Sequence, residues 1–233
     1  MLSMSNVSSG QAGNYYQKDD YYAREEHGQW QGKLADHEGL QGDVQPQDLQ
    51  EQFNAQKNPE RVGVDLTFSA PKSCSMAMHL DDKTRADVLD AHNKAVETTL
   101  RHAEQNCIFY RQTENHVTTP RQSDNMACAR FNHYVSRAQD PQLHTHAVIL
   151  NKTTGADGKV RAISNEKLYD SKMLLGQMYR SELARNLQEK GYQLEVTNRE
   201  KGFFELKGIT REQVESFSTR RAEIEAQLKA WDK

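Results

Sequence analysis

The chain has 233 residues, enough for one large domain with its own hydrophobic core. Hydrophobic residues make up 36% of it, the mean hydropathy is -0.92, and no apolar run has the length of a membrane span or a signal-peptide core. We therefore expect a soluble protein without membrane insertion. The formal net charge of -3 provides no overall positive field for nucleic acid. Three cysteines without a C-x-x-C pair favour a reducing cytoplasm and argue against both a disulfide framework and a thiolate metal site.

Two tyrosine doublets stand close together near the start of the chain, Tyr15-Tyr16 and Tyr21-Tyr22, among charged residues. Tyr15 and Tyr22 are seven positions apart and would share one face of a helix, so packing explains part of the set. The functional interpretation is that one or two of the phenols act as nucleophiles. Both interpretations can hold, because each doublet offers one ring for packing and one for chemistry.

The segment 61–68 alternates between apolar and other residues, which predicts a strand with Val62, Val64, Leu66 and Phe68 on one face. Asp65 lies in the middle of this strand, where acidic residues are depleted. An edge position facing water would explain it without any function. A turn follows at 69–73, then a long amphipathic helix at 81–104, whose histidines His92 and His102 are expected on its surface. A strand at 107–112 and a polar loop at 113–125 come next.

A strand pattern at 142–150 places His144 and His146 on the same face, one pleat apart. The preceding segment 126–133 also has the pattern of a strand and ends at His133. If these two strands pair, three imidazoles can approach a single divalent metal ion. The alternative is a polar strand face with ordinary hydrogen-bonded histidines.

Beyond this strand, a polar glycine-containing connection at 151–159 predicts a hairpin with residues 160–163. A helix is expected at 167–190 and ends before Gly191. Two strands are expected at 192–197 and 202–207, and a capping box at 210–213 begins a last helix. Seven basic and four acidic residues between positions 111 and 163 leave a local charge of +3 around the histidine strand.

These elements predict an α/β (α+β) fold: a central antiparallel sheet carries the three histidines, and helices pack on its other face. A parallel βαβ arrangement is disfavoured by the hairpin after Leu150. Because the chain ends inside a predicted helix, we expect residues 1–233 to form a single domain that is a piece of a longer protein.

Four motifs in order resemble the relaxase domain of MobF-type (TrwC/TraI-like) conjugative relaxases, in the HUH endonuclease superfamily. They are Met1-Leu2-Ser3, the two tyrosine doublets, the segment 65–73 (DLTFSAPKS) and the block 133–151 that begins HYVSRAQDPQLHTH. The resemblance covers essentially the whole chain. It implies an HUH/Rep-like relaxase fold and a domain that often continues into a helicase.

The resemblance implies that a tyrosine attacks single-stranded DNA at a plasmid origin of transfer and forms a 5′-phosphotyrosine. Tyr15 would make the first cut and Tyr21 would act on the transferred strand, with Tyr16 and Tyr22 as further candidates. The implied metal ligands are His133, His144 and His146, and the implied cofactor is a divalent ion, Mg²⁺ or Mn²⁺. Asp65 would orient a ligand histidine or accept the tyrosine proton, and orientation is favoured because carboxylates commonly support imidazole ligands.

For DNA binding the resemblance points to Arg137, and Lys72 is a second candidate for a phosphate contact. An ordinary surface salt bridge for Arg137 and a solvated turn for Lys72 are the alternatives. The implied partners are single-stranded and hairpin DNA at the origin, relaxosome accessory proteins and a type IV secretion coupling protein. We expect a monomer in the bacterial cytoplasm that is translocated with the DNA.

Two other functions remain open from the residues alone. A histidine-ligated metallohydrolase acting on small molecules would need no tyrosine doublets near its N-terminus. An origin-binding module would grip a DNA hairpin without cutting it. A covalent protein–DNA adduct would distinguish the relaxase from both alternatives.

Overall fold

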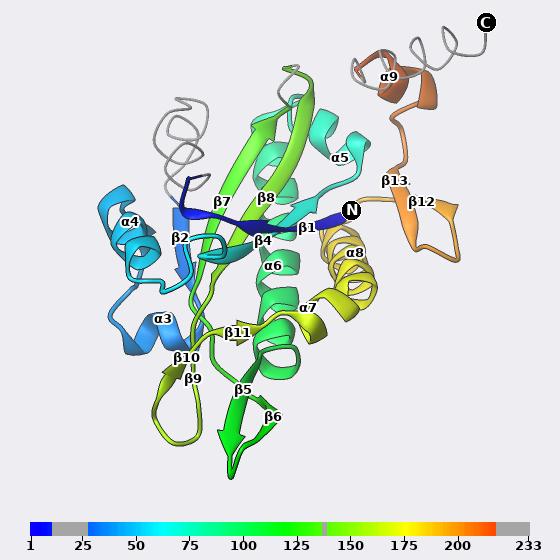
Figure 1. Ribbon diagram of the computed structural model, residues 1–233. Helices are drawn as coiled ribbons and strands as arrows, with labels where there is room; N and C mark the ends of the chain where they lie inside the picture. The colour runs from blue at the N-terminus through cyan, green and yellow to red at the C-terminus, as the bar shows by residue number, and fades with distance from the viewer. Residues whose placement is uncertain (11–27, 137–138, 218–233) are drawn as a thin grey trace, which may run out of the picture.

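The computed structural model describes residues 1–10, 28–136 and 139–217. Its centre is a six-stranded sheet in which all neighbouring strands are antiparallel, in the order β1-β4-β8-β7-β2-β3 (Figure 1). The predicted antiparallel sheet is therefore confirmed. In sheet order the strands are β1 Leu2–Val7, β4 Gly63–Ser69, β8 Pro141–Leu150, β7 Cys128–Val135, β2 Gly28–Gln31 and β3 Asp43–Val44.

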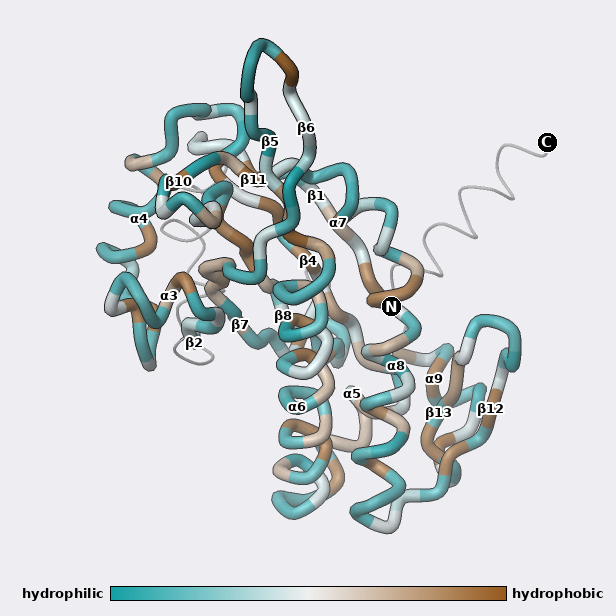
Figure 2. The backbone as a smooth tube through the Cα atoms, turned by 90° about the horizontal axis from the view of Figure 1, so that it is seen from below, coloured by the Kyte–Doolittle hydropathy of each residue, from teal (hydrophilic) through white to brown (hydrophobic). Residues whose placement is uncertain are grey.

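Two long helices cover one face of this sheet, α6 (Asp82–Asn106) and α8 (Lys172–Glu189), together with the short α5 (Lys72–Ala77) (Figure 1). Alternate residues of the central strands pack against them in the larger of two cores; in β8 these are Leu143, Ala147 and Ile149. Along α6 hydrophilic and hydrophobic segments alternate, as expected of a helix with one buried side (Figure 2).

The histidine face of the sheet is also partly covered by helices. Val148 and Leu150 of β8 pack in a second core with residues of α3 (Lys33–His37) and α4 (Pro46–Asn54). The expectation that helices lie on the other face holds for α6 and α8 but omitted this smaller layer. His144 and His146 lie on the same face, at the end of β8 away from the second core.

The remaining strands form small sheets at the periphery. The hairpin of β5 (Phe109–Glu114) and β6 (Val117–Gln122) projects from the body and pairs with β11 (Ile163–Ser164) (Figures 1 and 2). Residues 117–122, assigned to a loop from the sequence, are thus a strand. The hairpin predicted through residues 151–159 differs in its partner: β10 (Val160–Arg161) pairs with β9 (Thr153–Thr154), which lies inside the predicted connection, and not with β8.

The C-terminal part follows the predicted order with one difference. The helix expected at 167–190 is divided at Ser171 into α7 (Glu166–Asp170) and α8, and Gly191 follows α8 with a φ of 90°. β12 (Leu194–Asn198) pairs with β13 (Phe203–Leu206), and the Thr210 capping box opens α9 (Arg211–Ser216). Within the described residues, none of the helices is both long and apolar enough to cross a membrane.

Candidate active site

Three histidines meet on the β7–β8 pair. His133 of β7 lies directly opposite His144 of β8, and His146 follows one pleat further along β8. The three ring centroids are 5.2, 5.3 and 5.2 Å apart. Three imidazoles bound through nitrogen at about 2.1 Å to one tetrahedral ion would have centroids roughly 5 Å apart. The sheet register therefore brings together the three imidazoles that the sequence indicated.

Hydrogen bonds at Nδ1 fix the tautomers of the two β8 histidines. His144 Nδ1 donates to the backbone oxygen of Gln142 at 2.9 Å. His146 Nδ1 donates to Asp65 Oδ2 at 2.6 Å, and Thr67 Oγ1 lies 3.3 Å from the same nitrogen. Because both acceptors can only accept, the proton is on Nδ1, and in the neutral ring the lone pair is on Nε2. Nε2 is the nitrogen that would bind a metal.

Burial keeps two of these rings neutral. It is the main cause that lowers the pKa of His133 to about 2, with the neighbouring His144 and His146 adding to it. Burial likewise lowers the pKa of His144 to about 4, although its bond to the Gln142 carbonyl acts in the opposite direction. Neutral imidazoles are the form that binds divalent ions.

The donor set fits a divalent metal in its chemistry and in the separation of its rings. Within the described residues, however, no group of three or more histidine, cysteine, aspartate or glutamate side chains has its atoms already arranged as around a bound ion. The support for a metal therefore rests on the ring separations and on the tautomers at His144 and His146, and not on a completed coordination geometry.

Asp65 lies in β4 at the side of the histidine group. β4 is an interior strand between β1 and β8, and the aspartate is only 6% exposed, so the water-facing edge position considered from the sequence does not apply. Asp65 Oδ2 accepts the His146 bond, whereas Oδ1 is buried and has no hydrogen-bond partner among the described residues. A carboxylate in this place can orient the imidazole, and its second oxygen can accept a proton.

The other predicted site residues stand apart from this group or outside the described residues. Lys72 is the first residue of α5, three positions after Ser69, which pairs with His144. Partial burial lowers the pKa of Lys72, and the charge of Asp140 opposes that shift. Tyr15, Tyr16, Tyr21, Tyr22 and Arg137 lie outside the described residues.

Behind the histidines the structure adds residues that the sequence did not identify as part of the site. His92 was expected on the surface of the helix, but it is fully buried and bonds to Thr145, the residue between His144 and His146. A signal was present, since His92 follows Val88 by four positions and precedes Ala95 by three, which is the spacing of the buried stripe.

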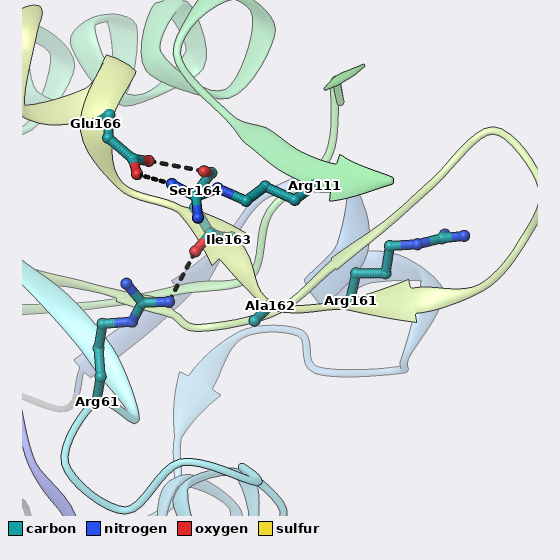
Figure 3. A pocket seen from close by; sticks show the side chains of 7 residues that line it. All are labelled: Arg61, Arg111, Arg161, Ala162, Ile163, Ser164 and Glu166. Carbon is teal, nitrogen blue, oxygen red and sulfur yellow. Dashed lines mark hydrogen bonds and ion pairs between the residues drawn. The ribbon is translucent and has the colours of Figure 1, made fainter. Parts of the chain in front are cut away.

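A separate pocket of about 270 Å³ lies beside β11 (Figure 3). Three arginines line it, and each already has a partner. Arg61 donates to the Ile163 backbone oxygen at 3.1 Å, Arg111 pairs with Glu166, and Arg161 pairs with Asp157 at 2.6 Å. In Figure 3 their guanidinium groups do not converge on one point. This pocket is not assigned a ligand.

The antiparallel sheet thus brings three histidines and a supporting carboxylate together, which is the kind of donor set that can bind a divalent ion. The family model described as TrwC relaxase matches residues 9–233. The chain belongs to the TrwC relaxase family, which confirms the predicted family.

Relatives agree with this assignment. The multifunctional conjugation protein TraI of Escherichia coli is 37% identical over 250 residues, which cover 94% of this chain and 14% of TraI. The chain thus spans about one seventh of that relative. The conjugative relaxase TrwC in its copper-bound complex with oriT DNA has a TM-score of 0.88 and 37% identity, over 100% of this chain and 84% of TrwC. TrwC with a 27-mer comprising the recognition hairpin and the cleavage site gives a TM-score of 0.87 at 37% identity, over the same shares of the two chains.

Proposed function

We propose that this chain is the strand-transferase domain of a conjugative relaxase that nicks and rejoins single-stranded DNA at a plasmid origin of transfer. The observation that carries the proposal is the convergence of His133, His144 and His146 on a sheet of the TrwC relaxase fold. The TrwC complexes with oriT DNA, one with the hairpin and cleavage site, support the same substrate for this chain.

The three histidines would hold a divalent metal through ring nitrogens, and the ion would polarise the scissile phosphate and offset negative charge that develops on it. Mg²⁺ or Mn²⁺ is our proposal for this ion. Copper-bound and metal-free complexes of TrwC show that this relative has been obtained with and without a metal. The hydrogen bond from His146 to Asp65 keeps the Nδ1 proton in place and aims Nε2 away from the carboxylate.

Tyr15 is the proposed first nucleophile. Its phenol oxygen forms a bond to phosphorus while the bond to the 3′ oxygen breaks, which yields a 5′-phosphotyrosine and a free 3′-hydroxyl. Because one phosphoester replaces another, the reverse attack rejoins the strand without an added energy source. A phenol with an ordinary pKa of about 10 needs a proton acceptor. Asp65 Oδ1, buried and without a described partner, is a candidate for that acceptor.

Tyr21 is proposed to attack a second strand while Tyr15 carries the first, with Tyr16 and Tyr22 as the other phenols of the doublets. Arg137 and Lys72 are proposed to contact phosphates. From the family we also propose that relaxosome accessory proteins and a type IV secretion coupling protein are partners. The protein would be a monomer and would lie in the bacterial cytoplasm before transfer. The length of TraI supports a longer native protein that carries further domains.

The test is formation of a covalent adduct with single-stranded DNA. The chain is incubated with Mn²⁺ and a pool of oligonucleotides that carry a long random segment, and DNA that stays attached in denaturing detergent is sequenced. We expect one enriched nick sequence and no adduct from a variant with all four doublet tyrosines changed to Phe. Mass spectrometry of the adduct should place the nucleotide on Tyr15. Attachment to Tyr16 or Tyr22 would contradict the assignment, and no adduct would reject the relaxase activity for this chain.

A further inference from the structure

A chain of hydrogen bonds, buried at its centre, lies on the helix-facing side of the β7–β8 pair, directly behind the histidines. His92 of α6 is its centre: Nδ1 is 2.8 Å from Tyr179 Oη of α8, and Nε2 is 2.7 Å from Thr145 Oγ1 of β8. Thr145 Oγ1 is 2.7 Å from Asn132 Oδ1 of β7, and Asn132 Nδ2 is 3.0 Å from Asn93 Oδ1 of α6. His92, Thr145 and Tyr179 are at most 1% exposed.

These bonds all run in one direction. Thr145 donates its single hydroxyl proton to the amide oxygen of Asn132, so it can only accept from His92. His92 must then carry its proton on Nε2. Burial, the main cause, lowers the pKa of His92 to about 3, so the ring is neutral and Nδ1 accepts from the Tyr179 hydroxyl. Tyr179, His92, Thr145, Asn132 and Asn93 thus form one continuous donor-to-acceptor chain.

Two members of this hydrogen-bonded chain are the immediate sequence neighbours of the three histidines. Thr145 lies between His144 and His146, and Asn132 precedes His133. Thr145 and Asn132 are directly opposite one another across β7 and β8. Because adjacent residues of a strand point to opposite faces, a rotation or shift of the backbone at Thr145 moves both flanking imidazoles.

We propose that His92 is a positioning residue for the histidine site: by bonding Thr145 and Tyr179 it fixes β7 and β8 against α6 and α8 in the alignment that makes His133, His144 and His146 converge. The inference rests on the proposed metal-dependent function of those histidines. An apolar residue at position 92 would fill the same space without a hydrogen-bonding requirement. The buried hydrogen bonds of His92 to Thr145 and Tyr179 instead favour one arrangement of strands and helices.

The test compares three variants of the full chain. His92→Leu removes both bonds. His92→Gln keeps a donor and an acceptor at the end of the side chain and should rescue. Val88→Ala is the matched control, because Val88 is fully buried on the same face of α6, one turn away, and makes no side-chain hydrogen bond. Each variant is titrated with Mn²⁺ by calorimetry and with Co²⁺ by visible absorption, at a temperature well below its melting point.

We expect His92→Leu to weaken Mn²⁺ binding about 10-fold, the size usual for residues that support metal ligands, and to change the Co²⁺ spectrum. His92→Gln should recover most of the affinity. Val88→Ala should lower the melting temperature without altering the affinity or the spectrum. In cleavage assays, His92→Leu should cut DNA more slowly than the wild type, and a higher Mn²⁺ concentration should restore part of the lost rate.

Wild-type affinity and spectrum in His92→Leu would overturn the positioning role, as would an equal loss of affinity in Val88→Ala. If His92→Leu does not fold, Tyr179→Phe breaks the bond to Nδ1 while keeping the ring that packs on Phe68 at 5.3 Å. It should then weaken Mn²⁺ binding a few-fold, and an unchanged affinity would again reject the role. Failure of the wild-type chain to bind either ion would instead reject the metal site in the proposed function, and the inference with it.

Discussion

Individual residues at the site differ in how well their sequence context revealed them. His144 and His146 are two positions apart on a strand, so their common face followed from the pleat alone. Asp65 was visible as an acidic residue in a strand, but its neighbour His146 is 81 positions away and comes beside it only because β4 pairs with β8. His92 was missed because a histidine in an amphipathic helix was assigned to the polar side.

Asp65→Asn tests the carboxylate at the histidine site. The amide oxygen can still accept the His146 Nδ1 bond, so the ring keeps its position, but the negative charge that makes the imidazole a stronger ligand is lost. We expect about 10- to 100-fold weaker Mn²⁺ binding and a corresponding loss of strand cleavage, measured by calorimetry and by adduct formation. Thr67→Val serves as the control, since Thr67 Oγ1 lies 3.3 Å from the same nitrogen without carrying charge. Equal effects of the two changes would argue against a special role of the carboxylate.

His92 should also make the stability of the folded chain depend on pH. Its pKa of about 3 in the folded state lies below the unfolded value of 6.5, so the unfolded state takes up the proton first as pH falls. The stability it contributes is complete above pH 6.5 and declines toward pH 3. Between pH 7 and pH 5, the protonation of this residue in the unfolded state lowers the free energy of unfolding by about 2 kcal/mol.

His92→Gln has no titrating group at this position. Urea unfolding of the metal-free wild type should therefore lose about 2 kcal/mol more between pH 7 and pH 5 than unfolding of this variant. All other groups titrate in both proteins, so they cancel in the difference. Parallel curves for the two proteins would show that His92 is protonated in the folded state or exposed to water.

Among the elements, the sequence identified the long amphipathic helix and the strands of alternating pattern, because their burial is regular. It missed β6, whose residues are almost all exposed and whose Pro120 is unusual in a strand. The hairpin turns through Asn115 and His116, with φ of 49° and 64°. A two-residue turn of this kind usually contains glycine, so the usual sign of a hairpin was absent.

One buried side chain links α6 to the start of α3 and to the residues just before β7. Glu104 near the end of α6 accepts hydrogen bonds with Oε1 from the backbone nitrogens of Lys33 at 2.7 Å and Met126 at 3.0 Å. It is 5% exposed, and burial, its largest influence, raises its pKa. Glu104→Ala leaves two buried donors without a partner, at a cost of about 1–3 kcal/mol for each.

We therefore expect urea unfolding of Glu104→Ala to show a loss of about 2–6 kcal/mol in the free energy of unfolding. Glu104→Gln keeps an oxygen acceptor at the same distance from the backbone and should lose less than half of that. Equal losses of stability in the two variants would show that the charge of Glu104 stabilises this link and that its hydrogen bonds to Lys33 and Met126 do not. Because β7 carries His133, the Ala variant should also bind Mn²⁺ less tightly.

At the scale of the molecule, the strand order explains how distant segments form one site. Placing β8 between β4 and β7 brings residues from three parts of the chain together. Pairing of β7 with β8 was predictable because they are close in sequence. The position of β4 was not, since periodicity identifies a strand but not its neighbours, and the resemblance to relaxases supplied that link.

DNA binding also belongs to the whole molecule, because the net charge of -3 hides a local charge of +3 over residues 111–163. Arg137→Ala should weaken binding of the selected oligonucleotide and lower the slope of log affinity against log salt by about 1, because one phosphate contact and its released counterion are lost. Arg185→Ala is the control: Arg185 lies on α8, on the other side of the sheet from the histidines, and pairs with Glu182 and Glu189. Fluorescence anisotropy at several salt concentrations gives both quantities. A wild-type slope in Arg137→Ala, or equal changes in the two variants, would show that Arg137 makes no phosphate contact.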